Sequence, residues 1–200
     1  MFRKNVVLAA TIAITSGLLL ASPAQAATPP APPDDAPDRT VYIDSPAPQV
    51  SIAGAKETTT ANGSIALRTT EGAVFPVTPE PGETVRVVYT NAVADISRAG
   101  SCTESVTTYT PYKSGNSARV NAAFTVSTGC SGARRGYVLL YAVTLAAQND
   151  APVSNNGYTT SFSASYTCAN TRSRSWYGIA RLGATGGTYG PSATLACDQP

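Results

Sequence analysis

The segment NTRSRSWYG, residues 170–178, combines the residue types best suited to binding a ligand. Two arginines precede the single tryptophan of the chain, and a tyrosine follows it. Guanidinium groups recognise phosphate or carboxylate, whereas aromatic rings stack on sugars or cations. In a strand, alternation would place both arginines and the indole on one face, where a tyrosine from the next strand could join them. We therefore predict a ligand-binding surface formed by Arg172, Arg174, Trp176, Tyr177 and Tyr189.

The same segment also has a purely structural interpretation. Trp176 could be a core residue packed near a disulfide, with the two arginines as its solvated flank. The sequence leaves both interpretations open.

A second candidate is the stretch TTSFSASYTC, residues 159–168, in which hydroxyl and mostly apolar residues alternate. One face carries Thr159, Ser161, Ser163, Ser165 and Thr167. Such a row could bind glycans or order water, or it could be the wet side of an ordinary sheet. A binding role would need a matching row nearby, which Thr103, Ser105 and Thr107 could supply.

The absence of histidine restricts the chemistry that the chain can perform. It removes Ser-His-Asp and Cys-His nucleophile activation and histidine-ligated metals. Paired carboxylates, as in glycoside hydrolysis, are the remaining enzymatic option. The acidic residues in or beside predicted strands are Glu71, Glu83, Asp95 and Glu104. We expect them to be solvated strand charges, with Glu104 opposite Arg119, and we predict no catalytic residue.

Metal binding has weak support in the sequence. A calcium ion could use the oxygens of Asn149, Asp150, Asn155 and Asn156, because hard cations prefer oxygen ligands. A zinc site is disfavoured because there is neither a C-x-x-C pair nor a histidine. We expect no metal and no cofactor.

These residues must be positioned by strands, because Ser, Thr, Val and Tyr are frequent and no capped amphipathic helix is found. Short alternating runs separated by Gly, Pro and Asn turns predict an all-β fold, an antiparallel β-sandwich with a β-barrel as the alternative. Residues 136–147 read as one strand buried on both faces, followed by a loop over 148–157.

The segment PGETVRVVYTN, residues 81–91, resembles the turn and strand that open many bacterial immunoglobulin-like domains. This resemblance implies an immunoglobulin-like sandwich in the broad sense and a bacterial source.

Four cysteines predict two disulfides. We predict the pairs Cys102–Cys130 and Cys168–Cys197, because each interval reads as two strands around a turn. Each bridge would close a hairpin at its base and add about 3–4 kcal/mol by the loop-entropy estimate.

The N-terminal region has the features of a secretory signal sequence. Residues 1–26 have a basic start, an apolar run and an Ala-Gln-Ala cleavage pattern, which predict a signal peptide, with an uncleaved anchor as the alternative. Residues 27–39 are rich in Pro and Asp and predict a disordered leader. Residues 40–200 are predicted to form a single disulfide-stapled β domain.

Without residues 1–26 the chain has twelve basic and twelve acidic residues, and this balanced charge argues against a nucleic-acid partner.

Together these observations predict a secreted, non-catalytic β-sandwich that acts as a binding or cell-envelope module. Its partner would be a glycan, an envelope polymer or an extracellular protein, with no membrane insertion after signal cleavage. The alternatives are a small extracellular hydrolase with paired carboxylates and a secreted inhibitor or toxin-like protein.

Overall fold

A computed structural model describes residues 36–50, 55–60, 62–70, 72, 75–184 and 186–200. The predicted signal peptide and most of the leader lie outside these residues. The described chain is all-β, and none of its elements is a helix long and apolar enough to span a membrane. Its strands are β1 (Arg39–Ile43), β2 (Ala55–Thr59), β3 (Ile65–Thr69), β4 (Thr84–Tyr89), β5 (Ala92–Ala99), β6 (Cys102–Tyr109), β7 (Tyr112–Ser114), β8 (Ser117–Val126), β9 (Arg134–Tyr141), β10 (Leu145–Val153), β11 (Thr159–Thr167), β12 (Asn170–Leu182), β13 (Thr188–Tyr189) and β14 (Ala193–Asp198).

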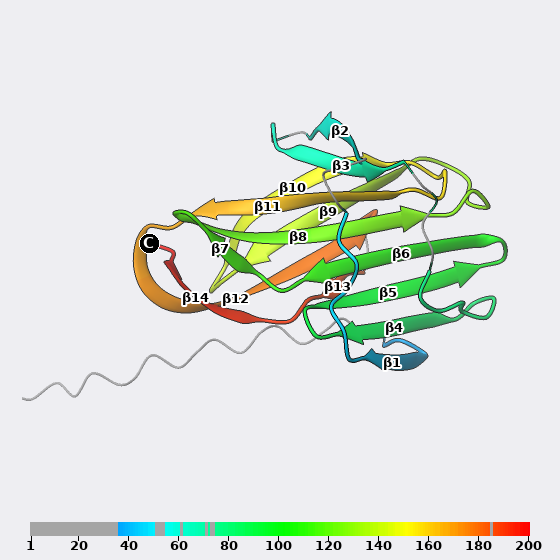
Figure 1. Cartoon of the computed structure of the whole chain (residues 1–200), viewed down its shortest axis with the longest axis horizontal. Coiled ribbons are helices and arrows are strands. Elements are labelled where there is room, and N and C mark those ends of the chain that lie inside the picture. Colours follow the sequence, from blue (N-terminus) through cyan, green and yellow to red (C-terminus); the bar gives the residue numbers. More distant parts are fainter. Residues whose placement is uncertain (1–35, 51–54, 61, 71, 73–74, 185) are drawn as a thin grey trace, which may run out of the picture.

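The strands form two sheets that pack face to face (Figure 1). The larger sheet has the order β1-β4-β5-β6-β8-β11-β3-β2, and β7 pairs with β8. The smaller sheet has the order β10-β9-β12-β13, and β14 pairs with β12. The β1–β4 pair is parallel, and the other described pairs are antiparallel. Neither sheet closes on itself over the described ranges, so the sandwich is confirmed over the barrel.

The main core lies between the two sheets. Alternate residues of β8 and β11 point into it, and the rings of Phe124 and Phe162 stack there with centroids 5.0 Å apart. Opposite them, the smaller sheet contributes Leu140 and the fully buried Trp176. The sheets approach closely at Gly178, where an added Cβ would lie only 2.4 Å from Val120. A glycine is therefore required at this point of β12.

A second core lies on the other face of the larger sheet. It gathers Val85 and Val87 of β4 with Ala94 and Ile96 of β5, all almost completely buried. The segments 44–50 and 75–79 cover this face, and in Figure 1 the chain after β1 can be followed across β5, β6 and β8. Because both faces are covered, residues 122–126 of β8 are buried without alternation.

The prediction of one continuous strand over residues 136–147 is wrong, because residues 136–141 belong to β9 and residues 145–147 to β10. The chain turns at 142–144, where the Ala142 N–H donates to the Thr144 carbonyl at 3.1 Å, and it returns as β10. The predicted loop over 148–157 is therefore partly strand. Pro152 lies within β10, which an edge strand allows because one side of its backbone needs no ladder partner.

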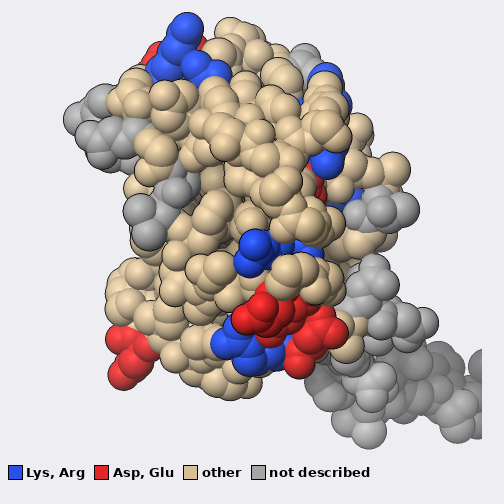
Figure 2. All heavy atoms as spheres, turned by 90° about the vertical axis from the view of Figure 1, so that its right-hand side faces the viewer, with Lys and Arg blue, Asp and Glu red and all other residues tan. Residues whose placement is uncertain are grey.

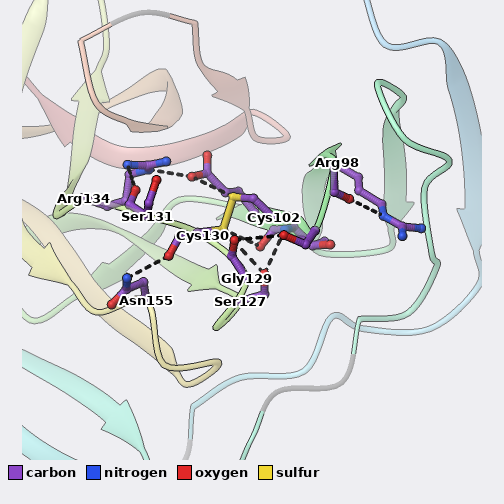
Figure 3. Close-up of a disulfide and its surroundings, with 12 residues drawn as sticks. Arg98, Cys102, Ser127, Gly129, Cys130, Ser131, Arg134 and Asn155 are labelled. Carbon is purple, nitrogen blue, oxygen red and sulfur yellow. Dashed lines mark hydrogen bonds and ion pairs between the residues drawn. A yellow bond between two sulfur atoms is a disulfide. The ribbon is translucent and has the colours of Figure 1, made fainter.

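Both predicted disulfides are confirmed. Cys102 at the start of β6 is bonded to Cys130, and Cys168 after β11 is bonded to Cys197 of β14. Figure 3 shows the first bridge beside Ser127 and Gly129, with Asn155 donating to the Cys130 carbonyl at 2.9 Å. Disulfides of this kind indicate an oxidising environment.

Candidate functional site

In the structure, the residues of the predicted ligand-binding surface in 170–178 and Tyr189 do not lie together on one exposed face. Trp176 is fully buried, its Nε1–H donates to the Cys197 carbonyl at 2.8 Å, and its ring lies 5.7 Å from that of Tyr166. Arg174 is paired with the Asp198 carboxylate, and this partner lowers the pKa of Asp198. The indole therefore offers no free face to a ligand, because this part of β12 packs against the larger sheet.

The two tyrosines of that prediction lie together on the opposite side of the smaller sheet. Tyr177 stacks on Tyr141 across β9 and β12, with centroids 5.1 Å apart and planes only 6° from parallel. Burial raises the pKa of Tyr177, and the neighbouring Tyr141 and Tyr189 raise it further. Tyr177 is 8% exposed as a residue, and its ring packs against that of Tyr141.

Two of the predicted carboxylates line one pocket of about 240 Å³ between the sheets. The Asp95 carboxylate accepts hydrogen bonds from Arg86 Nε at 2.8 Å, from Arg86 Nη2 at 2.9 Å and from the Thr188 hydroxyl at 3.0 Å. Glu104 accepts from Arg134 at 2.6 Å and lies opposite Val126 rather than opposite Arg119 as expected. Since both carboxylates are held by arginines, the pocket is suited to structural ion pairing more than to proton transfer.

Glu83 and Glu71, the remaining acidic residues of that prediction, form no second pair of neighbouring carboxylates within the described residues. Glu83 lies at the molecular surface, where Arg39 at 2.9 Å lowers its pKa, and Glu71 is outside the described residues. Figure 2 shows acidic and basic side chains side by side on this end of the molecule. Because opposite charges lie next to each other on the face drawn in Figure 2, that face has no strong electrostatic potential of one sign.

The predicted calcium ligands are also separated. Asn149 is buried and donates to the Ser163 carbonyl at 2.7 Å, whereas the next residue, Asp150, is paired with Arg135 on the other side of β10. Asn155 and Asn156 bind backbone groups of the following turn and of the Cys130 loop. Consecutive residues of a strand point to opposite faces, so this set cannot share one ion. All four cysteines are in disulfides, so none is available as a thiolate.

The hydroxyl row of β11 lies on the outer face of the larger sheet. Its register with β8 places Ser161 opposite Ala123 and Ser165 opposite Arg119. Ala123 lies in turn opposite Thr107 of β6, so both predicted hydroxyl rows share this face and β8 separates them.

Within the described residues, part of this face is not covered by the segments 44–50 and 75–79. The short strand β7 brings Tyr112 opposite Arg119, and its phenol donates to the Asn121 amide oxygen at 3.3 Å. The Tyr112 side chain is 39% exposed. We call this region the open strip, and it consists of Tyr112, Ser114, Ser117, Arg119, Asn121, Ser163, Ser165 and Thr167. None of these residues is acidic.

A hollow of about 110 Å³ adjoins the open strip. Asn121 and Ser163 belong to both, and Tyr109 and Ile65 also line the hollow. The strip and the hollow together offer an aromatic ring, several hydroxyls, an amide and one guanidinium. These groups are suited to a sugar, which presents hydroxyls and apolar ring faces.

Sequence reasoning missed Tyr112, Arg119 and Asn121. The signal was the Ser-Gly-Asn turn at 114–116, because strand pairing around it sets Tyr112 near Arg119. This signal was weak, since β7 has only three residues.

No family model matches the chain, and no curated protein matches it either.

Proposed function

We propose that this protein is a secreted, non-catalytic glycan-binding β-sandwich and that the open strip is its binding surface. The observation that carries the proposal is the half-exposed ring of Tyr112, held among hydroxyl and amide side chains on a strip without carboxylates. A tyrosine supplies an apolar ring and a polar tip at once, which suits a ligand that is hydroxylated at its edges.

Export is supported by two independent features. Residues 1–26 have the pattern of a cleavable signal peptide, and the two disulfides are typical of proteins that fold in an oxidising compartment. A secreted protein of near-balanced charge would meet glycans of the cell envelope or of its surroundings.

A non-catalytic role fits the state of the acidic groups. Glycoside hydrolysis needs one carboxyl group that stays protonated and a second that is ionised. In the described chain, Asp95 and Glu104 share a pocket, but each carboxylate is already paired with an arginine, Arg86 and Arg134 respectively.

The proposal is tested by retention of the secreted, processed protein on insoluble cellulose, chitin and peptidoglycan. We expect Tyr112→Ala to weaken retention on the bound polymer by about tenfold, in the range of a lost aromatic anchor. The matched control is Tyr42→Ala, which removes a tyrosine that is 78% exposed on the edge strand β1.

Retention of both variants at the wild-type level would overturn the proposed surface. Failure of the wild type to bind any of the polymers would overturn the proposed function. Circular dichroism and thermal unfolding of each variant show whether it remains folded.

A further inference from the structure

Arg119 and Arg172 differ from the other arginines of the described chain because their side chains form no ion pair and no hydrogen bond. Five arginines form ion pairs: Arg39, Arg86, Arg134, Arg135 and Arg174. Arg98 and Arg181 bind carbonyl oxygens, and Arg68 binds the Ser154 hydroxyl. Arg119 makes no such contact, and its Nε is shielded from water without a hydrogen-bond acceptor. Arg172 also has no ion pair, but its side chain lies on an exposed stretch outside the open strip.

The neighbours of Arg119 supply no negative charge. Tyr112 lies directly opposite it on β7 and Ser165 directly opposite it on β11. Asn121 and Ser117 flank it along its own strand. A buried guanidinium nitrogen without an acceptor is costly, and a carboxylate that pairs with the accessible part of this guanidinium would balance its charge.

We infer that the glycan bound at the open strip is an acidic polysaccharide and that Arg119 binds the carboxylates of its sugars. This inference rests on the proposed function. Arg119 would hold the carboxylate, the ring of Tyr112 would pack on the sugar, and Ser165 and Asn121 would bind its hydroxyls. All four side chains come from the three neighbouring strands β7, β8 and β11, which are spaced about 5 Å apart, so a short stretch of the polysaccharide reaches them together.

The test uses polymers that differ only in charge. Polygalacturonate and hyaluronan are each compared with their methyl esters, in which the backbone is kept and the carboxylate is neutralised. We expect the wild type to bind at least one of the acids about tenfold tighter than its ester, with an affinity that falls as salt is added. Arg119→Gln should bind acid and ester equally, and Arg119→Lys should restore only part of the preference because it lacks the planar fork. Arg172→Gln is the matched control and should keep the wild-type preference.

The outcomes separate this inference from the proposed function. A wild type that binds neither acid tighter than its ester overturns the acidic ligand, and so does an Arg119→Gln variant that keeps the preference. If Tyr112→Ala still weakens retention on an uncharged polysaccharide, the glycan-binding function survives that result. If the wild type binds no polymer of either panel, both proposals fail. An Arg119→Gln variant that unfolds at the same midpoint temperature as the wild type shows that a loss of preference does not come from unfolding.

Discussion

The outer face of the larger sheet has two halves that differ in what covers them. Over β4, β5 and part of β6 the residues are apolar, and the segments 44–50 and 75–79 close over them. Over β7, β8 and β11 the face carries the open strip, where Tyr112, Ser165 and Thr167 are exposed. The same sheet face thus serves as a core at one side and as a surface at the other.

Residue type alone does not separate the two halves. Ser105 and Thr125 are hydroxyl residues, yet they are 9% and 6% exposed because they lie beneath the covering segments. The hydroxyl of Thr125 is satisfied there by Thr159 at 2.8 Å. Ser165 and Thr167, from the same row as Thr159, are exposed. A hydroxyl row is therefore solvent-accessible only where no other described segment crosses it.

The largest expected effect is a loss of stability in the covered half. Ile96 is fully buried there, so Ile96→Ala should lower the free energy of unfolding by about 2–5 kcal/mol. The matched change in the open half, Ser165→Ala, should alter it by no more than about 0.5 kcal/mol. Urea unfolding monitored by tryptophan fluorescence measures both. Equal losses in the two variants would show that the open strip is packed like a core.

The next effect concerns the tyrosine that holds the covering segment. The Tyr109 phenol donates to the Pro48 carbonyl, and burial raises its pKa to about 12 from 10.0. Above pH 10 the unfolded chain releases this proton while the folded chain keeps it, so stability is lost as the pH rises through this window. The loss attributable to Tyr109 should approach about 2–3 kcal/mol near pH 12.

Tyr109→Phe isolates this contribution. At neutral pH it should cost about 0.5–1.5 kcal/mol for the lost hydrogen bond. Between pH 10 and 12 its stability should fall less steeply than that of the wild type, as measured by urea unfolding at several pH values. Parallel pH profiles for the two proteins would mean that Tyr109 is ionised freely and does not hold the segment.

The sequence predicts the strands and the disulfides well because both depend on local patterns. Alternation in residues 159–168 gives β11, and the positions of Cys102 and Cys130 around one hairpin give their pairing. The fold of residues 44–50 could not be predicted in this way. That segment has no strand pattern, and its role is set by what it covers.

The candidate site depended on tertiary contacts that no local pattern carries. The sequence leaves Trp176 open to two interpretations, a stacking residue or a core residue, and the packing of β12 against β8 shows that it belongs to the core. Tyr112 lies in a three-residue strand, too short for a periodic signal. Arg119 becomes notable only once its neighbours on β7 and β11 are known to lack a carboxylate.

A smaller effect on stability should follow from placing a carboxylate inside the open strip. Ser165→Glu would face Arg119 directly across the strands and form an ion pair there, adding about 0.2–1 kcal/mol to the free energy of unfolding. The same change should remove the preference for acidic polysaccharide, because the guanidinium is then occupied. Thr167→Glu is the control, since it adds the same charge opposite Ser117 instead. If both variants lose binding equally, general repulsion of the polymer explains the result and Arg119 has no special role.

The smallest effect on stability tests where the binding surface ends. Ser163 belongs to both the open strip and the hollow, and it is half-buried on β11. Ser163→Val keeps a good strand former and should change the free energy of unfolding by no more than about 0.5 kcal/mol. It removes a hydroxyl from the path between Arg119 and the hollow, so retention on the bound polysaccharide should fall by roughly three- to tenfold, the equivalent of one lost hydrogen bond. Affinity measurements beside urea unfolding separate the two effects. Binding at the wild-type level would mean that the glycan contacts end at Tyr112 and Arg119, and that the hollow belongs to the covered half of the face.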